Sequence, residues 1–288
     1  MLAVLAMRLA VAAATVELRT DAASCLVDID DGARIVSFRI GDAEALWNDN
    51  PPQIRAADWA HGGIPVCWPR FGVGRDGRIH GTAWRRPFKI LRQCAEPNRA
   101  ELALGLSEDQ ARLEYSIVLT DVLSLEMTTT NVGTNCFMCS CGFHPYLRVA
   151  ERERVVVDGL DSLSFEDDPS RKNPERGVWH GPLGLTSSID RIFRLPDARS
   201  GAFTLTDRAG GRRIFVWCEG ASHVNIWNPG EEKNCPGVVP GDEWRRFACA
   251  EPILVGDAGG GPLPIPPGGS RVLKMTIRAV GCEQETEK

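Results

Sequence analysis

Apolar and polar residues alternate with a period of two through most of the regular segments of this 288-residue chain. In Arg112–Leu119 every second residue is apolar, from Leu113 onward, as in a strand with one buried face. The pattern breaks at Asp121 and then resumes. The sequence therefore predicts an antiparallel hairpin over Arg112–Thr130.

Other short segments show a strand-like pattern, and clusters of Gly, Pro and Asp separate them. No long helical pattern with caps occurs, which favours an all-β sandwich or barrel over a parallel α/β fold. A turn at Pro266–Gly269 precedes the last segment, which is predicted to be the closing strand. The segments are Cys25–Ile40, Val155–Val157, Phe203–Thr206, Arg212–Cys218, His223–Trp227 and Arg271–Val280.

The chain is long enough for two average domains, but all-β folds of this size often form one domain, and residues 1–288 are predicted to be a single domain. The charged tail Gln284–Lys288 is expected to be frayed. The acidic stretch Phe165–Arg176 is predicted to be a long solvated loop. A monomer is expected.

Net charge and cysteine content narrow the possible partners and compartment. A formal charge of −5 and a pI near 5.6 argue against nucleic acid and anionic membranes as partners, because both need a positive field. Ten cysteines at irregular spacing indicate reduced thiols and a cytoplasmic location. The apolar N-terminus resembles an export signal, but Arg8 interrupts it. No membrane-spanning helix is predicted.

His144 and Glu251 are candidate proton-transfer residues. Pro145 ends the strand that leads to His144, and the residues on its face become smaller along that strand, which leaves room for a ligand. Glu251 shares strand parity with Phe247 and Cys249, so it needs a buried partner or a raised pKa. A core histidine bonded to backbone and a surface glutamate at a strand end remain the structural alternatives.

Other candidate ligand-binding residues also have ordinary structural readings. Asp190 offers a carboxylate, or forms an ion pair with Arg191. Indoles beside Gly- and Pro-rich segments can stack on a ligand, or pack in the core. Clustered arginines can hold an anion, or form a solvated loop. These tryptophans and arginines are Trp68, Trp84, Trp227, Arg70, Arg75, Arg78, Arg85 and Arg86.

A metal site is not predicted. Cys136, Cys139 and Cys141 invite a metal reading, but strand parity puts Cys136 on the opposite face from the other two. One strand cannot aim all three thiols at the same ion.

Six segments, taken in chain order, resemble the glucose-6-phosphate 1-epimerase (hexose-6-phosphate mutarotase) family, which is related to aldose 1-epimerase. Each segment alone is a weak signal, but six in order across most of the chain are specific. They are His61–Gly72, His80–Ala83, Gly142–Tyr146 with Arg148 and Val149, Asp190–Phe193, Trp227–Pro229 and Cys249–Pro252.

The resemblance implies a galactose mutarotase-like supersandwich of antiparallel sheets, with activity on a small-molecule sugar or sugar phosphate and no metal or organic cofactor. It implies that His144 protonates the ring oxygen and that Glu251 takes the proton from the anomeric hydroxyl. His80 and Asp190 match positions that contact substrate hydroxyls. We expect His144 and Glu251 to face one cleft, with roughly a sugar ring between them.

The chain departs from the family pattern at the phosphate-binding end. His61 and Trp84 stand where the family usually has arginines, His223 replaces an aspartate, and Gly230 replaces an aromatic residue. Arg70, Arg85 or Arg86 could hold the phosphate instead. The favoured hypothesis is an aldohexose 6-phosphate mutarotase with a shifted substrate preference.

Two alternatives stay open. One is an aldose 1-epimerase acting on a neutral hexose, in which His61 and Trp84 contact hydroxyls and a ring face. The other is a non-catalytic carbohydrate-binding protein, which would have no need of a proton relay.

Overall fold

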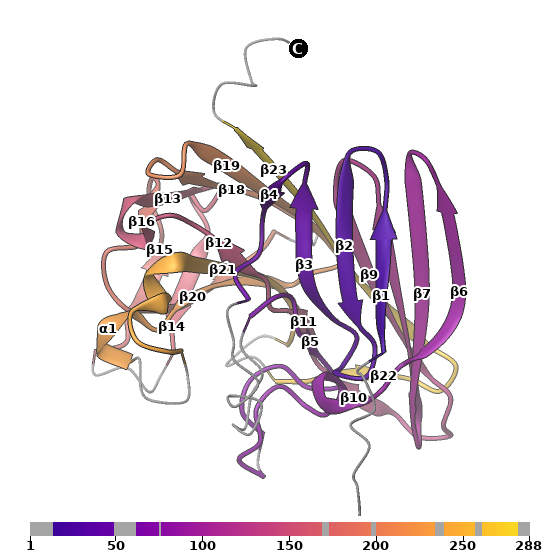
Figure 1. Cartoon of the computed structure of the whole chain (residues 1–288). Coiled ribbons are helices and arrows are strands. Elements are labelled where there is room, and N and C mark those ends of the chain that lie inside the picture. The colour runs from indigo at the N-terminus through magenta and orange to yellow at the C-terminus, as the bar shows by residue number, and fades with distance from the viewer. Residues whose placement is uncertain are drawn as a thin grey trace, which may run out of the picture.

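Strands dominate the computed structural model, which describes residues 14–48, 62–74, 76–168, 173–196, 200–233, 239–256 and 261–281. His61, Arg75, the apolar residues 1–13 and the tail Gln284–Lys288 lie outside these ranges. Within them the chain is an all-β assembly of antiparallel sheets (Figure 1), as the alternation predicts. None of the helices among these residues has the length and apolar character that a bilayer crossing needs.

The N-terminal strands form a small antiparallel sheet in the order β1–β2–β3–β4. A separate two-stranded ribbon pairs β10 with β22. The strands are β1 (Thr15–Arg19), β2 (Ala23–Asp28), β3 (Arg34–Ile40), β4 (Ala43–Glu44), β10 (Phe137–Cys139) and β22 (Leu263–Ile265).

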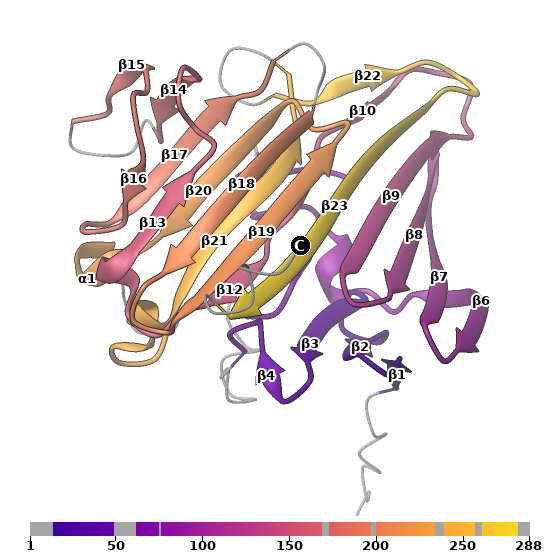
Figure 2. The ribbon, with the colours of Figure 1, turned by 90° about the horizontal axis from the view of Figure 1, so that it is seen from above.

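A nine-stranded sheet forms one wall of the molecule (Figure 2). It contains the predicted hairpin and the predicted closing strand, β23, which pairs with β9 and β19. In spatial order its strands are β16 (Leu183–Gly184), β13 (Val155–Asp158), β18 (Ser200–Asp207), β19 (Arg212–Glu219), β23 (Ser270–Gly281), β9 (Leu123–Asn131), β8 (Ala111–Leu119), β7 (Arg99–Glu108) and β6 (Lys89–Glu96).

An eight-stranded sheet forms the second wall. Its strands, in spatial order, are β15 (Arg176–Val178), β14 (Ser164–Asp167), β17 (Ile189–Arg194), β20 (His223–Asn228), β21 (Phe247–Leu254), β11 (Cys141–Phe143) and β5 (Val66–Cys67), with β12 (Tyr146–Arg148) also paired to β21. Among the described residues, helices are limited to single turns, η2 (Ala83–Arg85), η3 (Arg152–Arg154), α1 (Gly230–Lys233) and η4 (Glu243–Arg246).

The prediction of a solvated loop over Phe165–Arg176 is wrong at both ends of that stretch. Phe165 lies in β14 and Arg176 in β15, and the two strands pair with each other. Asp167 is buried and accepts hydrogen bonds of 2.6 and 3.1 Å from Arg191. The two hydrogen bonds from Arg191 stabilise the buried carboxylate of Asp167 within β14. The acidic composition of this stretch had instead predicted a loop in solvent.

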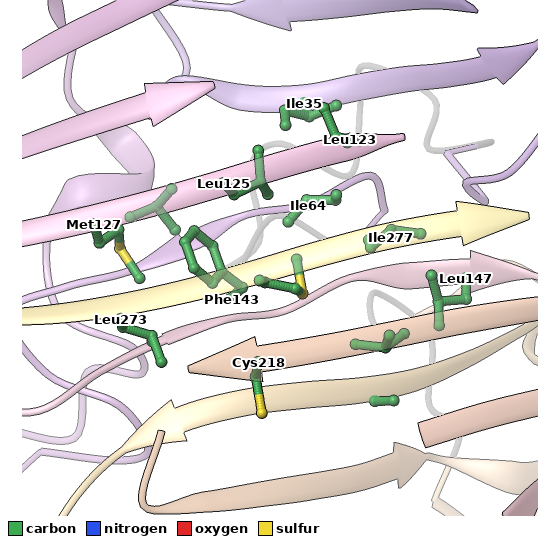
Figure 3. Packing of buried hydrophobic residues seen from close by; sticks show 14 of the residues in the cluster. Ile35, Ile64, Leu123, Leu125, Met127, Phe143, Leu147, Cys218, Leu273 and Ile277 are labelled. Atoms are coloured by element: carbon green, nitrogen blue, oxygen red, sulfur yellow. The ribbon is translucent and has the colours of Figure 1, made fainter. Parts of the chain in front are cut away.

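The main core fills the space between the sheets (Figure 3). Phe143 of β11 meets side chains of β9 and β23, including Leu125 and Leu273. One contiguous cluster joins residues of the four-, eight- and nine-stranded sheets. Since this core covers one face of the eight-stranded sheet, the other face is available for a functional site.

Candidate active site

Glu251 lies in the middle of β21, a strand buried along its whole length. Residues of one parity, Ala248 and Ala250, join the main core. Phe247 and Cys249, of the other parity, pack in a separate aromatic cluster with Trp47 and Tyr146. Glu251 shares this second parity, as the sequence predicts. Its carboxyl group is therefore placed on the face of the sheet that the main core leaves open.

The carboxyl group of Glu251 is fully buried, and no described residue makes a hydrogen bond to either of its oxygens. Burial raises the pKa of Glu251 well above its ordinary value, the negative charge of Asp190 raises it further, and the nearby amide of Asn225 acts in the opposite direction. Desolvation makes the charged form costly, so this carboxyl group holds a proton more tightly than a surface glutamate does.

His144 follows β11 directly and faces Glu251. Its Nε2 lies 3.4 Å from Oε1 of Glu251, and both side chains are almost completely buried. The imidazole stacks on Tyr146 at 4.8 Å between ring centroids and meets the edge of Trp227 at 5.5 Å. The aromatic rings of Tyr146 and Trp227 therefore fix the plane of the imidazole. Nε2 of His144 is thereby held close to the carboxyl group of Glu251.

The imidazole of His144 and the carboxyl group of Glu251 are closer together than the sequence predicts. We expected roughly a sugar ring between them. A separation of 3.4 Å between Nε2 and Oε1 instead fits two substrate oxygens bonded to the same carbon. The ring oxygen and the hydroxyl of an anomeric carbon have that relationship, so one donor and one acceptor can serve both at once.

His80 joins this pair from the loop between Gly72 and η2. Its ring meets the imidazole of His144 edge-on at 5.5 Å and contacts Phe71 at 4.9 Å. The backbone has a φ of +56°, a region that histidine tolerates better than most residues. Its Nδ1 accepts a hydrogen bond from the backbone N–H of Gly72 at 3.2 Å, which puts the proton of the neutral ring on Nε2.

β17 and β20 contribute polar and aromatic side chains to the same face. Asp190 lies opposite Trp227 in the register, and Asn225 lies opposite Glu251. The Nδ2 of Asn225 donates to Oδ1 of Asp190 at 3.2 Å. The face therefore combines hydrogen-bonding groups with an aromatic wall formed by Trp227 and Tyr146, the combination that binds the hydroxyls and the apolar face of a polyol.

The sequence analysis missed Asn225. Asn225 lies within the apolar run His223–Trp227 and is buried, and a buried amide in a strand needs a partner. That polar interruption was visible in the sequence. What the sequence could not show was the register that puts Asn225 opposite Glu251.

Trp84 and the predicted arginines pack against and pair with other residues. Trp84 is buried in a small cluster with Cys67, and Phe71 packs against this cluster and also contacts His80. The guanidinium of Arg85 stacks over Trp84 at 4.1 Å. Arg86 pairs with Glu108 at 3.1 Å, and Arg70 pairs with Asp76 at 3.1 Å.

Cys249 gives the site a third group that can bind a metal. Ligand atoms of His144, Cys249 and Glu251 lie within 4.8 Å of one another. Burial raises the pKa of the Cys249 thiol well above its ordinary value, with Glu251 adding to the shift. A metal ion needs the thiolate and the carboxylate in their charged forms, and this environment disfavours both.

Comparison with known proteins identifies relatives over most of the chain. A family model described as Aldose 1-epimerase matches residues 14–258. A Salmonella typhimurium protein provisionally named glucose-6-phosphate 1-epimerase is 26% identical over 237 residues, with 77% of each chain covered.

Two solved structures share the fold. A provisionally described mutarotase from Salmonella typhimurium superposes with a TM-score of 0.75 at 22% identity, over 94% of this chain and 95% of that one. A galactose mutarotase-like protein from Clostridium acetobutylicum gives a TM-score of 0.71 at 14% identity, over 93% and 95%. These likenesses confirm the predicted galactose mutarotase-like fold.

Proposed function

Because the chain belongs to the aldose 1-epimerase family, we propose that it interconverts the α and β anomers of an aldohexose 6-phosphate, with His144 and Glu251 as the acid–base pair. The observation that carries the residue assignment is the 3.4 Å approach of the His144 Nε2 to the Glu251 carboxylate. We further propose that the protein is a cytoplasmic monomer and that it needs no metal or organic cofactor.

Ring opening requires one proton donor and one proton acceptor at the same carbon. Protonated His144 donates to the ring oxygen, the carboxylate of Glu251 takes the proton of the anomeric hydroxyl, and the bond between the anomeric carbon and the ring oxygen breaks. The products are an open-chain aldehyde, neutral His144 and protonated Glu251. Each positioned acid or base typically contributes about 10²–10⁴-fold to the rate.

Ring closure reverses these transfers after rotation about the C1–C2 bond. The chain hydroxyl attacks the other face of the aldehyde and loses its proton to His144, while Glu251 returns its proton to the carbonyl oxygen. The pair carries one proton in total before and after turnover, on one residue or the other. The raised pKa of Glu251 supports this sharing, because it brings the proton affinity of the carboxyl group closer to that of a histidine.

The remaining side chains of this face position the sugar in the proposal. His80, Asp190 and Asn225 bind hydroxyls, and Trp227 packs against the apolar face of the ring. Of Arg70, Arg85 and Arg86, the one we assign to the phosphate is Arg85, which is exposed above Trp84. The name of the Salmonella relative also supports a 6-phosphate substrate.

A neutral hexose is the second candidate substrate, and a specific observation favours it. Arg70 and Arg86 are already paired with Asp76 and Glu108, so both give up part of their charge to carboxylates. A site that holds a phosphate dianion normally leaves its arginines for the ligand.

The decisive experiment is magnetisation-exchange NMR of the α and β anomers of glucose 6-phosphate, glucose and galactose. Wild type should accelerate exchange, with the largest effect on the phosphate. Glu251→Gln and His144→Asn should each lose at least about a hundredfold in rate, whereas Glu219→Gln, a change at an exposed position on the nine-stranded sheet, should not.

Each outcome has a clear meaning. Faster exchange of glucose than of its phosphate would favour the neutral hexose. Folded wild-type protein that accelerates no sugar would overturn the catalytic proposal and favour a carbohydrate-binding protein.

A further inference from the structure

A cavity of about 670 Å³ lies away from the His144–Glu251 pair, where the ends of β4, β12, β19, β23 and η4 meet. It contains none of the residues assigned above to the sugar site. Arg148, Arg212 and Arg246 line it together with Asp207 and Glu243. Its volume falls within the range of about 300–1,000 Å³ typical of small-molecule sites.

Hydrogen bonds to backbone carbonyls hold the three arginines in place. Arg148 Nε donates to Leu46 at 3.2 Å, Arg246 Nη1 to Ala150 at 2.8 Å, and Arg212 Nη1 to Glu44 at 2.8 Å. Within the part of the chain that the structure describes, the bond to Ala150 is the one hydrogen bond that the guanidinium of Arg246 makes. Most of its five N–H donors are therefore left for a ligand.

The two acidic residues of the cavity already have other partners. Asp207 is fully buried and accepts hydrogen bonds from the backbone N–H groups of Ala150 and Gly210, both at 2.9 Å. The Glu243 carboxylate accepts the indole N–H of Trp47 at 2.8 Å. Among the described residues, three arginines and two acidic residues line the cavity, and Asp207 also pairs with Arg212 at 3.6 Å.

Arg212 is a partly buried cation that lies close to a second one, Arg148. Burial lowers the pKa of its guanidinium, and the charge of Arg148 lowers it further, while Asp207 at 3.6 Å from Nε partly opposes the shift. A buried cation beside a second cation is stabilised when an anion binds between them.

We propose that this cavity binds the phosphate group of a small phosphomonoester. Planar guanidinium groups match the oxygens of a phosphate, and three arginines line the same cavity. The cavity is larger than a phosphate needs, which leaves room for an organic part. A Cβ added at Gly211 or Gly281 on its wall would meet no atom within 4 Å, so the ligand can approach the backbone there.

Calorimetric titration with glycerol 3-phosphate tests the site, because this compound has no anomeric carbon and cannot be turned over. At constant ionic strength in chloride, we expect one binding event per chain. Arg246→Gln should weaken it at least tenfold. Ala43→Glu adds a carboxylate at an exposed lining position without removing any arginine bond, and should weaken binding similarly even if Arg246→Gln does not fold.

Two variants are expected to bind as wild type does. Arg245→Gln makes the same charge change one residue away, at an exposed arginine that pairs with Glu153 and does not line the cavity. Glu251→Gln changes the sugar site. A titration with inorganic phosphate separates the two sources of the anion, since weaker binding than glycerol 3-phosphate indicates that the organic part is also contacted.

Three results would overturn the proposal. The first is no binding above the chloride background. The second is binding that only Glu251→Gln weakens, which would place the phosphate in the sugar site. The third is equal weakening by Arg245→Gln and Arg246→Gln, which would indicate unspecific attraction to a basic surface.

Discussion

The buried carboxyl group of Glu251 destabilises the folded chain and is also the base that the proposed reaction needs. Its pKa is raised in the folded state, chiefly by burial, from an ordinary value of 4.5. Above about pH 4.5 the unfolded chain therefore loses this proton while the folded chain keeps it. The contribution of Glu251 to the free energy of unfolding then falls by about 1.4 kcal/mol per pH unit, until the folded-state pKa is reached.

Glu251→Gln removes this pH dependence, because an amide does not ionise in this range. We expect the stability of the variant relative to wild type to increase steadily as pH rises above about 4.5, with catalysis lost throughout. Urea unfolding at several pH values between 5 and 8 measures the difference. Parallel stability curves for the two proteins would contradict the assignment of a raised pKa to Glu251.

The cluster of His144, Cys249 and Glu251 predicts how the site responds to metals. The proposed mechanism needs no ion, so extensive dialysis against a chelator should leave mutarotation unchanged. One equivalent of added Zn²⁺ should not inhibit, because burial disfavours the charged thiolate and carboxylate that the ion needs. Loss of activity on chelation, restored by one equivalent of metal, would show that the three groups bind an ion during turnover.

At the scale of elements, β11 connects the proton-transfer pair to the loop that carries His80. A Cβ added at Gly142 would lie 2.8 Å from Phe71 Cδ2 and 2.9 Å from Ile253 Cγ2. Phe71 contacts the ring of His80, so Gly142→Ala should displace both rings. We expect about a tenfold loss in kcat/KM and a lower Tm, since overpacking costs about 1–3 kcal/mol.

Gly184→Ala is the matched control, because a Cβ at this glycine in β16 meets no atom within 4 Å. Both variants are assayed by NMR exchange and thermal unfolding. Full activity in Gly142→Ala would mean that Phe71 moves without disturbing His80, and that His80 has no close role in binding.

The strands that the sequence predicts are those whose pattern is local. β8 and β9 alternate buried and less buried residues along nine positions each, and period two is visible without knowing any partner. β5, β11 and β12 have two or three residues each and are held by pairing with distant strands. These strands are too short to show an alternating pattern, although they position His144. The role of His144 could therefore be assigned only from the resemblance to a known family.

At the scale of the whole molecule, the sequence does not predict which residues become neighbours across strands and sheets. The parity of Glu251 was predictable from β21 alone, but its neighbours depend on which strands lie on either side. Asn225 is opposite Glu251 because β20 and β21 are adjacent, and the fully buried hydroxyl of Tyr115 depends on how the two large sheets meet. Neither relation is encoded within a single segment.

Tyr115 gives the last prediction, which concerns the contact between the sheets. Its side chain on β8 is fully buried and meets Phe143 of β11 at 6.0 Å between ring centroids. Among the described residues its hydroxyl has no hydrogen-bond partner, and burial raises its pKa well above the ordinary value. Removing a buried polar group that lacks a partner is stabilising by about 1 kcal/mol.

Tyr115→Phe should therefore raise Tm by about 2 °C and leave mutarotation unchanged, since the residue lies across the main core from His144. Phe143→Leu alters the same contact from the other sheet and should lower the free energy of unfolding by about 1 kcal/mol or more, because it leaves a cavity. Calorimetry of both variants measures the opposed effects. A lower Tm in Tyr115→Phe would mean that the hydroxyl has a partner, such as a buried water, that joins the two sheets.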